Sequence, residues 1–239
     1  MACIIHIETS LKICSVAVSV NGEQVFVREN SQQSHSASLG VFAEEAIEIL
    51  SKEGKSPEAV VVSSGPGSYT GLRIGVSLAK GLCYGLEIPL IAIPTLQIMT
   101  VGAIRELKQR GIEINATDRF APLSDARRME VYTAIYSQDM TEIVAEQAMI
   151  IDKNSFSDIL AQRRVWFFGD GSNKCRTELR SPNAIFLENI NPSASMMISL
   201  AERKFMDREF EDLAYFEPFY LKEFQATVPK NKFPFQNGK

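Results

Sequence analysis

The order of apolar and polar residues near the start of the chain predicts three short β-strands. Residues 3–7 are apolar apart from one histidine, and residues 13–20 set small side chains on one face and mainly valine on the other. Asn21-Gly22 comes next, and both residues tolerate the positive φ of a two-residue hairpin turn. Since residues 25–27 begin another strand, the chain starts with an antiparallel β-meander, which a Rossmann domain does not.

Segments with helical periodicity alternate with strands beyond this meander. We expect helices over residues 34–50, 72–86 and 95–108, and buried strands at 59–62 and 88–93. In the second half we expect strands at 119–123, 130–136 and 165–168, and a last long helix over 193–205. The order β-β-β-α-β-α-β, followed by a partial second copy, predicts an α/β protein with the two-lobed architecture of actin and the sugar kinases.

This order also predicts the division of the chain into lobes. The first lobe is expected over residues 1–104, with the C-terminal helix able to complete it, and the second over residues 105–239. From about residue 228 the chain is polar, basic and proline-containing, which predicts a mobile tail or a docking arm.

Composition narrows the class of protein. The chain has 239 residues, 45% of them hydrophobic and 23% charged, which is ordinary for a globular protein. A net charge of −4 argues against an autonomous nucleic-acid binder. No apolar run approaches the ~20 residues of a membrane helix, and the first ten residues do not resemble a signal peptide. We therefore expect a cytoplasmic protein without a membrane segment.

Cysteine and histidine are too few and too scattered to predict a metal centre. The four cysteines form no C-x-x-C pair, so we interpret them as reduced core residues. His6 lies in an apolar strand, where a buried, hydrogen-bonded histidine is expected. His35 begins a helix among serines, which is typical of a helix start or an interface contact. We predict no bound metal.

A glycine-rich block, Gly65-Pro66-Gly67-Ser68-Tyr69-Thr70-Gly71, carries the strongest candidate chemistry. It joins an expected strand to an expected helix, and glycines at such a junction permit positive φ and close backbone approach beside the helix N-terminus, where anions bind. The spacing is neither the G-x-G-x-x-G of a Rossmann domain nor the G-x-x-x-x-G-K-[ST] of a P-loop. A tight turn without a ligand and a phosphate or partner site remain equally good interpretations.

Two polar clusters give weaker signals. Glu8-Thr9-Ser10 follows the first strand, where actin-like ATPases carry acidic and hydroxyl groups, although a capped turn at the lobe cleft explains it better. Asp125, Arg127 and Glu130 surround a turn and are candidate anion or partner contacts, or else a solvated charge cluster. Gly169-Asp170-Gly171 is a weak candidate for a second phosphate turn.

Taken together, these motifs resemble the TsaB (YeaZ) family of bacterial tRNA threonylcarbamoyladenosine biosynthesis proteins, paralogues of TsaD. The block from Gly65 to Gly75 is the most specific element. The other residues that carry the resemblance are Ile7-Glu8-Thr9-Ser10 with Cys14 to Ala17, His35, Pro94-Thr95-Leu96, Asp125 to Arg127 with Glu130 to Tyr132, and Glu217 to Leu221.

The resemblance implies the actin-like ATPase fold, built from two ribonuclease-H-like lobes. It also implies a role in forming N6-threonylcarbamoyladenosine at position 37 of tRNAs that read codons starting with A. The chain would be a non-catalytic subunit that binds and activates the TsaD transferase, is joined by the ATPase TsaE, reaches tRNA through the complex, and forms a homodimer when TsaD is absent.

The same resemblance suggests which chemistry is missing. TsaD holds its metal through an H-x-x-x-H pair, and the equivalent positions here are Thr95 and Met99, which are poor metal ligands. Glu8 stands where aspartate is usual in the family, which weakens the case for nucleotide binding. We expect no tightly bound cofactor, and ATP or ADP only at the level of the complex. The candidate nucleotide contacts are Glu8, Thr9, Gly65, Gly67 and Gly71.

The helices over 35–50 and 72–86 are the expected partner surface, because small residues allow another helix to approach closely. The candidate interface residues are His35, Arg73, Ile74, Ser77, Leu78, Gly81 and Leu82. Two other hypotheses remain open. One is a stand-alone actin-like ATPase or kinase, and the other is a metallopeptidase, which would need metal ligands that the sequence does not show.

Overall fold

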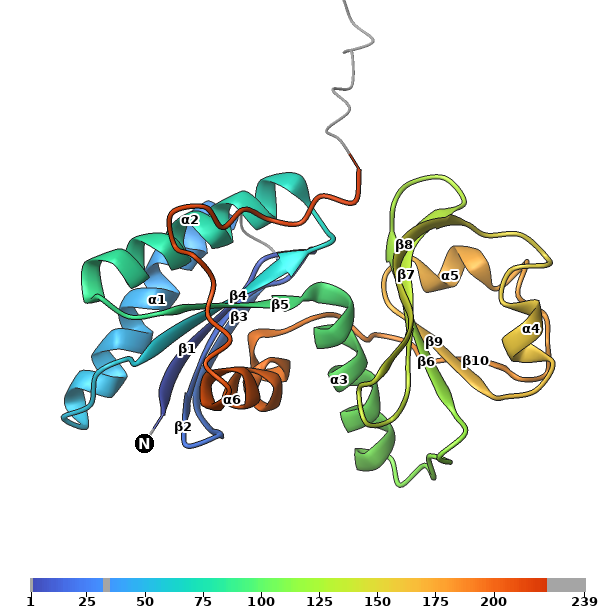
Figure 1. The fold of residues 1–239 in the computed structure, drawn as a ribbon, viewed down its shortest axis with the longest axis horizontal. Helices are drawn as coiled ribbons and strands as arrows, with labels where there is room; N and C mark the ends of the chain where they lie inside the picture. The colour runs from blue at the N-terminus through green and yellow to red at the C-terminus, as the bar shows by residue number, and fades with distance from the viewer. Residues whose placement is uncertain (1, 32–34, 223–239) are drawn as a thin grey trace, which may run out of the picture.

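The computed structural model describes residues 2–31 and 35–222, which form two five-stranded sheets (Figure 1). The first sheet has the order β3-β2-β1-β4-β5. Its first three strands pair antiparallel, and β1, β4 and β5 run parallel. Its strands are β1 (Cys3–Glu8), β2 (Cys14–Val20), β3 (Glu23–Asn30), β4 (Ala59–Gly65) and β5 (Leu90–Pro94).

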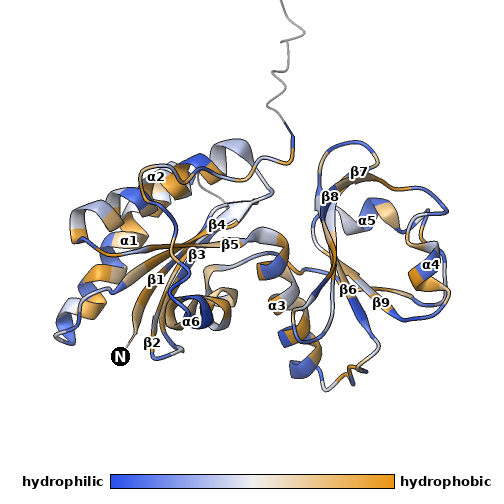
Figure 2. Ribbon diagram, in the orientation of Figure 1, coloured by the Kyte–Doolittle hydropathy of each residue, from blue (hydrophilic) through white to orange (hydrophobic). Residues whose placement is uncertain are grey.

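Helices cover both faces of this sheet, which explains the continuous apolar runs in its parallel strands β4 and β5, whereas the edge strand β3 is largely exposed. Ile5 and Ile7 pack with α1 (His35–Lys52) and α2 (Tyr69–Leu86) on one face. Ile4 packs on the other face with α6 (Ile198–Met206) and the short 3₁₀ helix before it (194–196). Figure 2 shows the hydrophobic colour concentrated on the strands and both colours mixed on the helices.

The second sheet has the order β10-β9-β6-β7-β8. The helix α3 (Thr95–Gln109) leads to it and lies between the two sheets (Figure 1). Ile98 packs on the first sheet, whereas Leu96 and Met99 pack on the second. Different sides of α3 therefore contribute to the hydrophobic cores of the two sheets. The remaining elements are β6 (Arg119–Asp125), β7 (Glu130–Tyr136), β8 (Glu142–Ile150), α4 (Ser157–Leu160), β9 (Val165–Phe168), α5 (Ser172–Cys175) and β10 (Ala184–Phe186).

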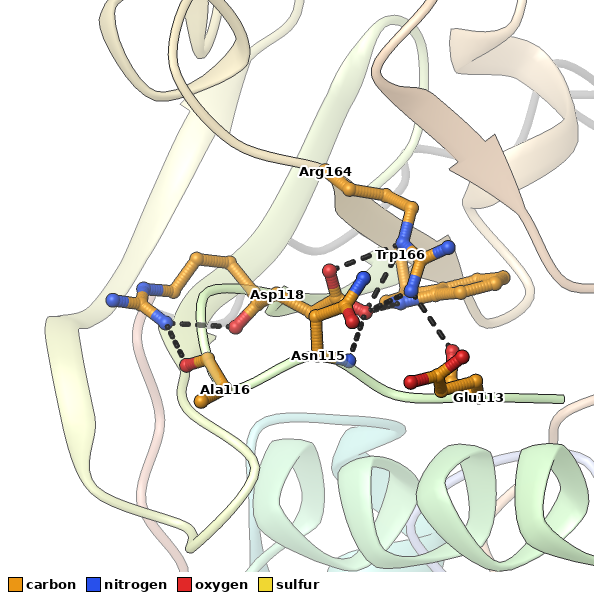
Figure 3. Close-up of polar contacts among 7 residues, drawn as sticks. Glu113, Asn115, Ala116, Asp118, Arg164 and Trp166 are labelled. Atoms are coloured by element: carbon orange, nitrogen blue, oxygen red, sulfur yellow. Dashed lines mark hydrogen bonds and ion pairs between the residues drawn. The ribbon is translucent and has the colours of Figure 1, made fainter.

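A buried carboxylate fastens the chain where it enters the second sheet (Figure 3). Asp118 accepts hydrogen bonds from Arg164 Nε at 3.0 Å, from Trp166 Nε1 at 3.0 Å and from the Asn115 N–H at 3.1 Å. Arg164 also donates to the carbonyl of Glu113 at 2.9 Å. Burial alone would raise the pKa of Asp118, but these hydrogen bonds outweigh it and hold the pKa below its ordinary value. The cluster ties the α3–β6 connection to β9.

The structure confirms the expected meander and most of the expected elements. Asn21 and Gly22 both have positive φ, as the hairpin prediction requires. Three expectations are wrong in detail. The helix after the glycine block begins at Tyr69 rather than at residue 72, and the strand expected from residue 88 begins at Leu90. The helix expected over 193–205 is two elements, because Ser193 caps the 3₁₀ turn that precedes α6.

The chain ends, as far as it is described, in an extended segment. Residues 207–222, which we call the C-terminal strap, run from α6 back across α2 (Figure 1). Lys80 on α2 donates to the carbonyls of Ala214 at 3.2 Å and Phe216 at 3.1 Å. The basic tail expected from about residue 228 lies outside the described residues, and the division into lobes stays a prediction.

Candidate functional site

The glycine block forms the turn between β4 and α2. Gly65 ends the strand with a φ of 108°, which an L side chain rarely adopts. Ser68 caps the helix, and its Oγ accepts the Gly71 N–H at 3.2 Å. Gly65 alone of the three predicted glycines has a positive φ, so Gly67 and Gly71 are needed for another reason.

That reason is the close approach of the turn that follows β1. A Cβ on Gly67 would lie 2.3 Å from the carbonyl oxygen of Ser10, and one on Gly71 would lie 2.2 Å from that of Thr9. A Cβ on Gly75 would lie 2.2 Å from Thr9 Oγ1. The Ser68 N–H also donates to the Ser10 carbonyl at 2.6 Å. The space beside these glycines is therefore filled by the protein's own Thr9 and Ser10.

Glu8 lies beneath this contact and is fully buried. Its Oε1 accepts the Ser10 N–H at 2.5 Å. Burial raises the pKa of this carboxyl to about 7, against the opposing effect of the nearby polar groups of Ser10, Ser63 and Thr9. Within the described residues, Glu8 Oε2 and the hydroxyls of Thr9, Ser10 and Ser63 make no hydrogen bond of good geometry. A proton on Glu8 would remove its buried negative charge and supply a hydrogen-bond donor to one of these unpaired oxygens.

A cleft of about 1110 Å³ opens above the turn, between the two sheets. It brings together residues from both halves of the chain that the sequence singled out separately: His35, Gly67, Asp125, Arg127 and Glu130. It also contains residues that sequence reasoning missed as site residues, and only their place inside or next to the quoted motifs could have pointed to them. These are Lys12, Tyr69, Tyr132, Tyr220 and Lys222, whereas Arg128, which also lines the cleft, belongs to the charged turn that the sequence singled out.

The far wall of the cleft is the turn between β6 and β7. Asp125 accepts the Arg127 N–H at 2.7 Å and binds Lys174 Nζ at 2.5 Å. Burial would raise the pKa of Asp125, but these contacts outweigh it and lower the pKa. Asp170, from the predicted Gly-Asp-Gly turn, accepts the Asp125 N–H at 3.0 Å, and burial raises its pKa. Asp170 therefore supports the neighbouring turn.

The C-terminal strap forms the side of the cleft. The Phe219 N–H donates to the Ser64 carbonyl at 2.7 Å. The rings of Tyr220 and Tyr69 lie 4.8 Å apart, and Arg73 Nε donates to Tyr220 Oη at 3.3 Å. Lys222 pairs with Glu130 of the second sheet. The strap thus contacts both walls of the cleft.

The predicted interface residues separate into different environments. Arg73, Ser77 and Gly81 are exposed on α2. Half-buried side chains on the same helix pack against the first core: Ile74, Leu78 and Leu82. His35 lines the cleft, and its Nε2 is 2.8 Å from the Leu11 carbonyl.

The remaining candidates are core residues. His6 is fully buried with its Nε2 2.8 Å from Ser19 Oγ, and burial lowers its pKa to about 3. All four cysteines are buried and reduced. Thr95 and Met99 are buried too. Among residues 2–31 and 35–222, no three His, Cys, Asp or Glu side chains gather in a way that could hold a metal ion. In the same part of the chain, no helix is long and apolar enough to cross a membrane.

Two sheets of this topology, joined through a helix and facing each other across a cleft with a glycine-rich turn, define a two-lobed protein of the actin-like, ribonuclease-H-like class. Residues 25–230 match the family model of TsaD, tRNA N6-adenosine threonylcarbamoyltransferase. The chain belongs to this family, and within it the relatives that match along most of their length are TsaB proteins.

The similarity covers almost the whole chain. The Haemophilus influenzae tRNA threonylcarbamoyladenosine biosynthesis protein TsaB is 25% identical over 233 residues, which cover 92% of this chain and 93% of that protein. The Escherichia coli TsaB is 28% identical over 228 residues, 92% of this chain and 94% of that protein. The solved structure of YeaZ from Pseudomonas aeruginosa has a TM-score of 0.72 at 24% identity and covers 92% of this chain and 100% of that one, which supports the fold.

Proposed function

We propose that this chain takes part in threonylcarbamoyladenosine biosynthesis on tRNA, as a non-catalytic subunit that binds and activates a TsaD transferase. The names of its full-length relatives support the pathway. The ATPase TsaE would join the complex, tRNA would be reached through the complex, and the location would be the cytoplasm. ATP or ADP would be bound at the level of the complex.

The observation that carries the proposal is the exposed face of α1 and α2. A Cβ added at Gly40, Gly81 or Gly85 would meet no atom within 4 Å, so the backbone of both helices is open to a neighbour. Tyr84 on the same helix pair is 82% exposed and Val41 is 52% exposed. Open glycines beside exposed apolar side chains suit a helix of a partner protein, which could approach the backbone closely.

Two features favour a subunit without catalysis of its own. Thr95 and Met99 stand at the positions where the resemblance to TsaD would require metal ligands, and neither is a good one. The glycines of the turn pack against Thr9 and Ser10, so this packing accounts for them without a phosphate. Both features also argue against the alternative of a stand-alone ATPase or kinase.

The experiment is a substitution at Gly81, where the side chain has room and cannot disturb the core. Gly81→Glu should abolish association with TsaD of the same organism, measured by size-exclusion chromatography with light scattering. Gln109→Glu is the control: it adds the same charge at an exposed position on α3, away from this face, and should retain association. Full association of the Gly81→Glu variant would move the interface elsewhere. Loss of a homodimer alone, with TsaD binding intact, would assign the face to self-association.

A further inference from the structure

Three cations line the cleft without a partner. In residues 2–31 and 35–222, the side chains of Lys12, Arg127 and Arg128 make no hydrogen bond or ion pair. The carboxylates around them are already engaged: Asp125 binds Lys174, Glu130 binds Lys222, and Asp170 accepts the Asp125 N–H. The cleft therefore presents uncompensated positive charge, although the chain as a whole carries a net charge of −4.

The two arginines occupy backbone positions that do not suit them. Arg127 has a φ of 73° and Arg128 a φ of 51°, a region that favours glycine and asparagine. The turn is held in place by the Arg127 N–H bond to Asp125 and by the Ala126 N–H bond to the Glu130 carbonyl at 3.1 Å. Such a turn keeps both guanidinium groups at the cleft at a cost in backbone strain, which calls for a functional reason.

Aromatic rings stand beside these charges. Tyr69, Tyr132 and Tyr220 line the same cleft, and the guanidinium of Arg73 lies 4.3 Å from the centre of the Tyr69 ring. All three rings are half-buried. Proteins bind single-stranded nucleic acids with aromatic rings next to basic groups, because bases stack on the rings while the cations meet the phosphates.

We propose that this cleft binds a single-stranded segment of RNA, with Lys12, Arg127 and Arg128 on the phosphates and Tyr132 and Tyr220 against the bases. The inference rests on the proposed function, which supplies an RNA substrate to the complex. A free nucleoside triphosphate fits less well, because the glycines of the turn are already accounted for by their packing on Thr9 and Ser10. The cleft, at about 1110 Å³, also exceeds what one nucleotide needs.

The test uses the variant Arg127→Asn/Arg128→Gly, which puts residues that tolerate positive φ into the turn while removing both charges. Binding of a fluorescently labelled single-stranded anticodon-loop RNA is measured by anisotropy, with the full-length chain alone and in complex with TsaD. We expect the variant to bind about tenfold more weakly at low salt. The slope of log affinity against log salt concentration should fall by about 1.4, from two lost phosphate contacts at ~0.7 each.

The control is Arg105→Gln/Lys108→Gln, which removes the same charge from exposed positions on α3 outside the cleft. It should bind RNA like the unmodified chain. The proposal is overturned if the unmodified chain and its complex bind no RNA, if both variants bind equally, or if ATP displaces the RNA, which would make the cleft a free-nucleotide site. Association of the arginine variant with TsaD is measured in parallel. If the variant still binds TsaD but the chain binds no RNA, the RNA proposal fails while the proposed subunit role stands.

Discussion

Two glycines on one helix should respond in opposite ways to the same substitution. Gly81→Ala adds a methyl group where no atom lies within 4 Å. Because alanine is favoured over glycine in a helix interior, this variant should be more stable by about 0.5–1 kcal/mol. Gly71→Ala has the same helix preference but places its Cβ 2.2 Å from the Thr9 carbonyl oxygen.

The size of the second effect follows from that distance. Ordinary contact begins at 3.4 Å, so the two backbones must separate by about 1.2 Å. Overpacking of this kind costs about 1–3 kcal/mol, and the atom displaced here is backbone, which yields least. Because the helix preference is the same at both positions and cancels, the two variants should differ by the overpacking cost, about 1–3 kcal/mol in the free energy of unfolding.

Urea denaturation measures this difference. With an m value of about 3 kcal/mol/M, the midpoints of the two variants should lie up to about 1 M apart, with Gly81→Ala above and Gly71→Ala below the unmodified chain. The m value should not change. Equal midpoints for the two variants would refute the explanation that the glycine block is needed for packing. They would favour the explanation that it binds an anion.

Two further predictions concern buried carboxyl groups. Asp118→Asn should lower the free energy of unfolding by about 2 kcal/mol at neutral pH, because Arg164 and Trp166 lose a charged acceptor. The folded pKa of Asp118 is depressed, so the stability that this carboxylate contributes is lost as the pH falls through that pKa. The urea midpoints of the variant and the unmodified chain should therefore converge in acid. A difference in midpoint that stays constant with pH would contradict the role given to the Asp118 charge. Glu8→Gln should have the opposite dependence. The folded pKa of Glu8 is about 7 against 4.5 for a free carboxyl, so its contribution is present below 4.5 and is lost as the pH rises through 7. The variant should gain on the unmodified chain between these values in a pH series of urea midpoints, and parallel curves would show that Glu8 is charged throughout.

The sequence predicted the regular elements best where burial on both faces leaves a continuous apolar run. β9 was predicted with its observed bounds, Val165–Phe168, for this reason. β8 (Glu142–Ile150) was missed, because it lies at the edge of its sheet and carries glutamates and a glutamine between its apolar residues. An edge strand pairs with one neighbour and is covered on one face, so its sequence carries only a weak pattern of apolar residues.

The cleft was harder to predict than the fold, because its walls are distant in the sequence. Pro66 and Gly67 face residues about sixty positions further along, and Lys222 meets Glu130 from the far end of the described chain. The sequence pointed to the glycine block, but the reason for its glycines is the close approach of the Thr9 carbonyl. The spacing of residues in the sequence does not predict such a contact. The unpartnered arginines and their positive φ are likewise properties of the folded turn alone.

The most direct test of the central claim, an essential non-catalytic subunit, is an omission experiment. TsaD, TsaE, threonylcarbamoyl-adenylate synthase, ATP, threonine, bicarbonate and a substrate tRNA are combined with and without this chain, and the modified nucleoside is quantified by mass spectrometry. We predict that product forms only when the chain is present and that the chain alone hydrolyses no ATP. Equal product without the chain would contradict the claim.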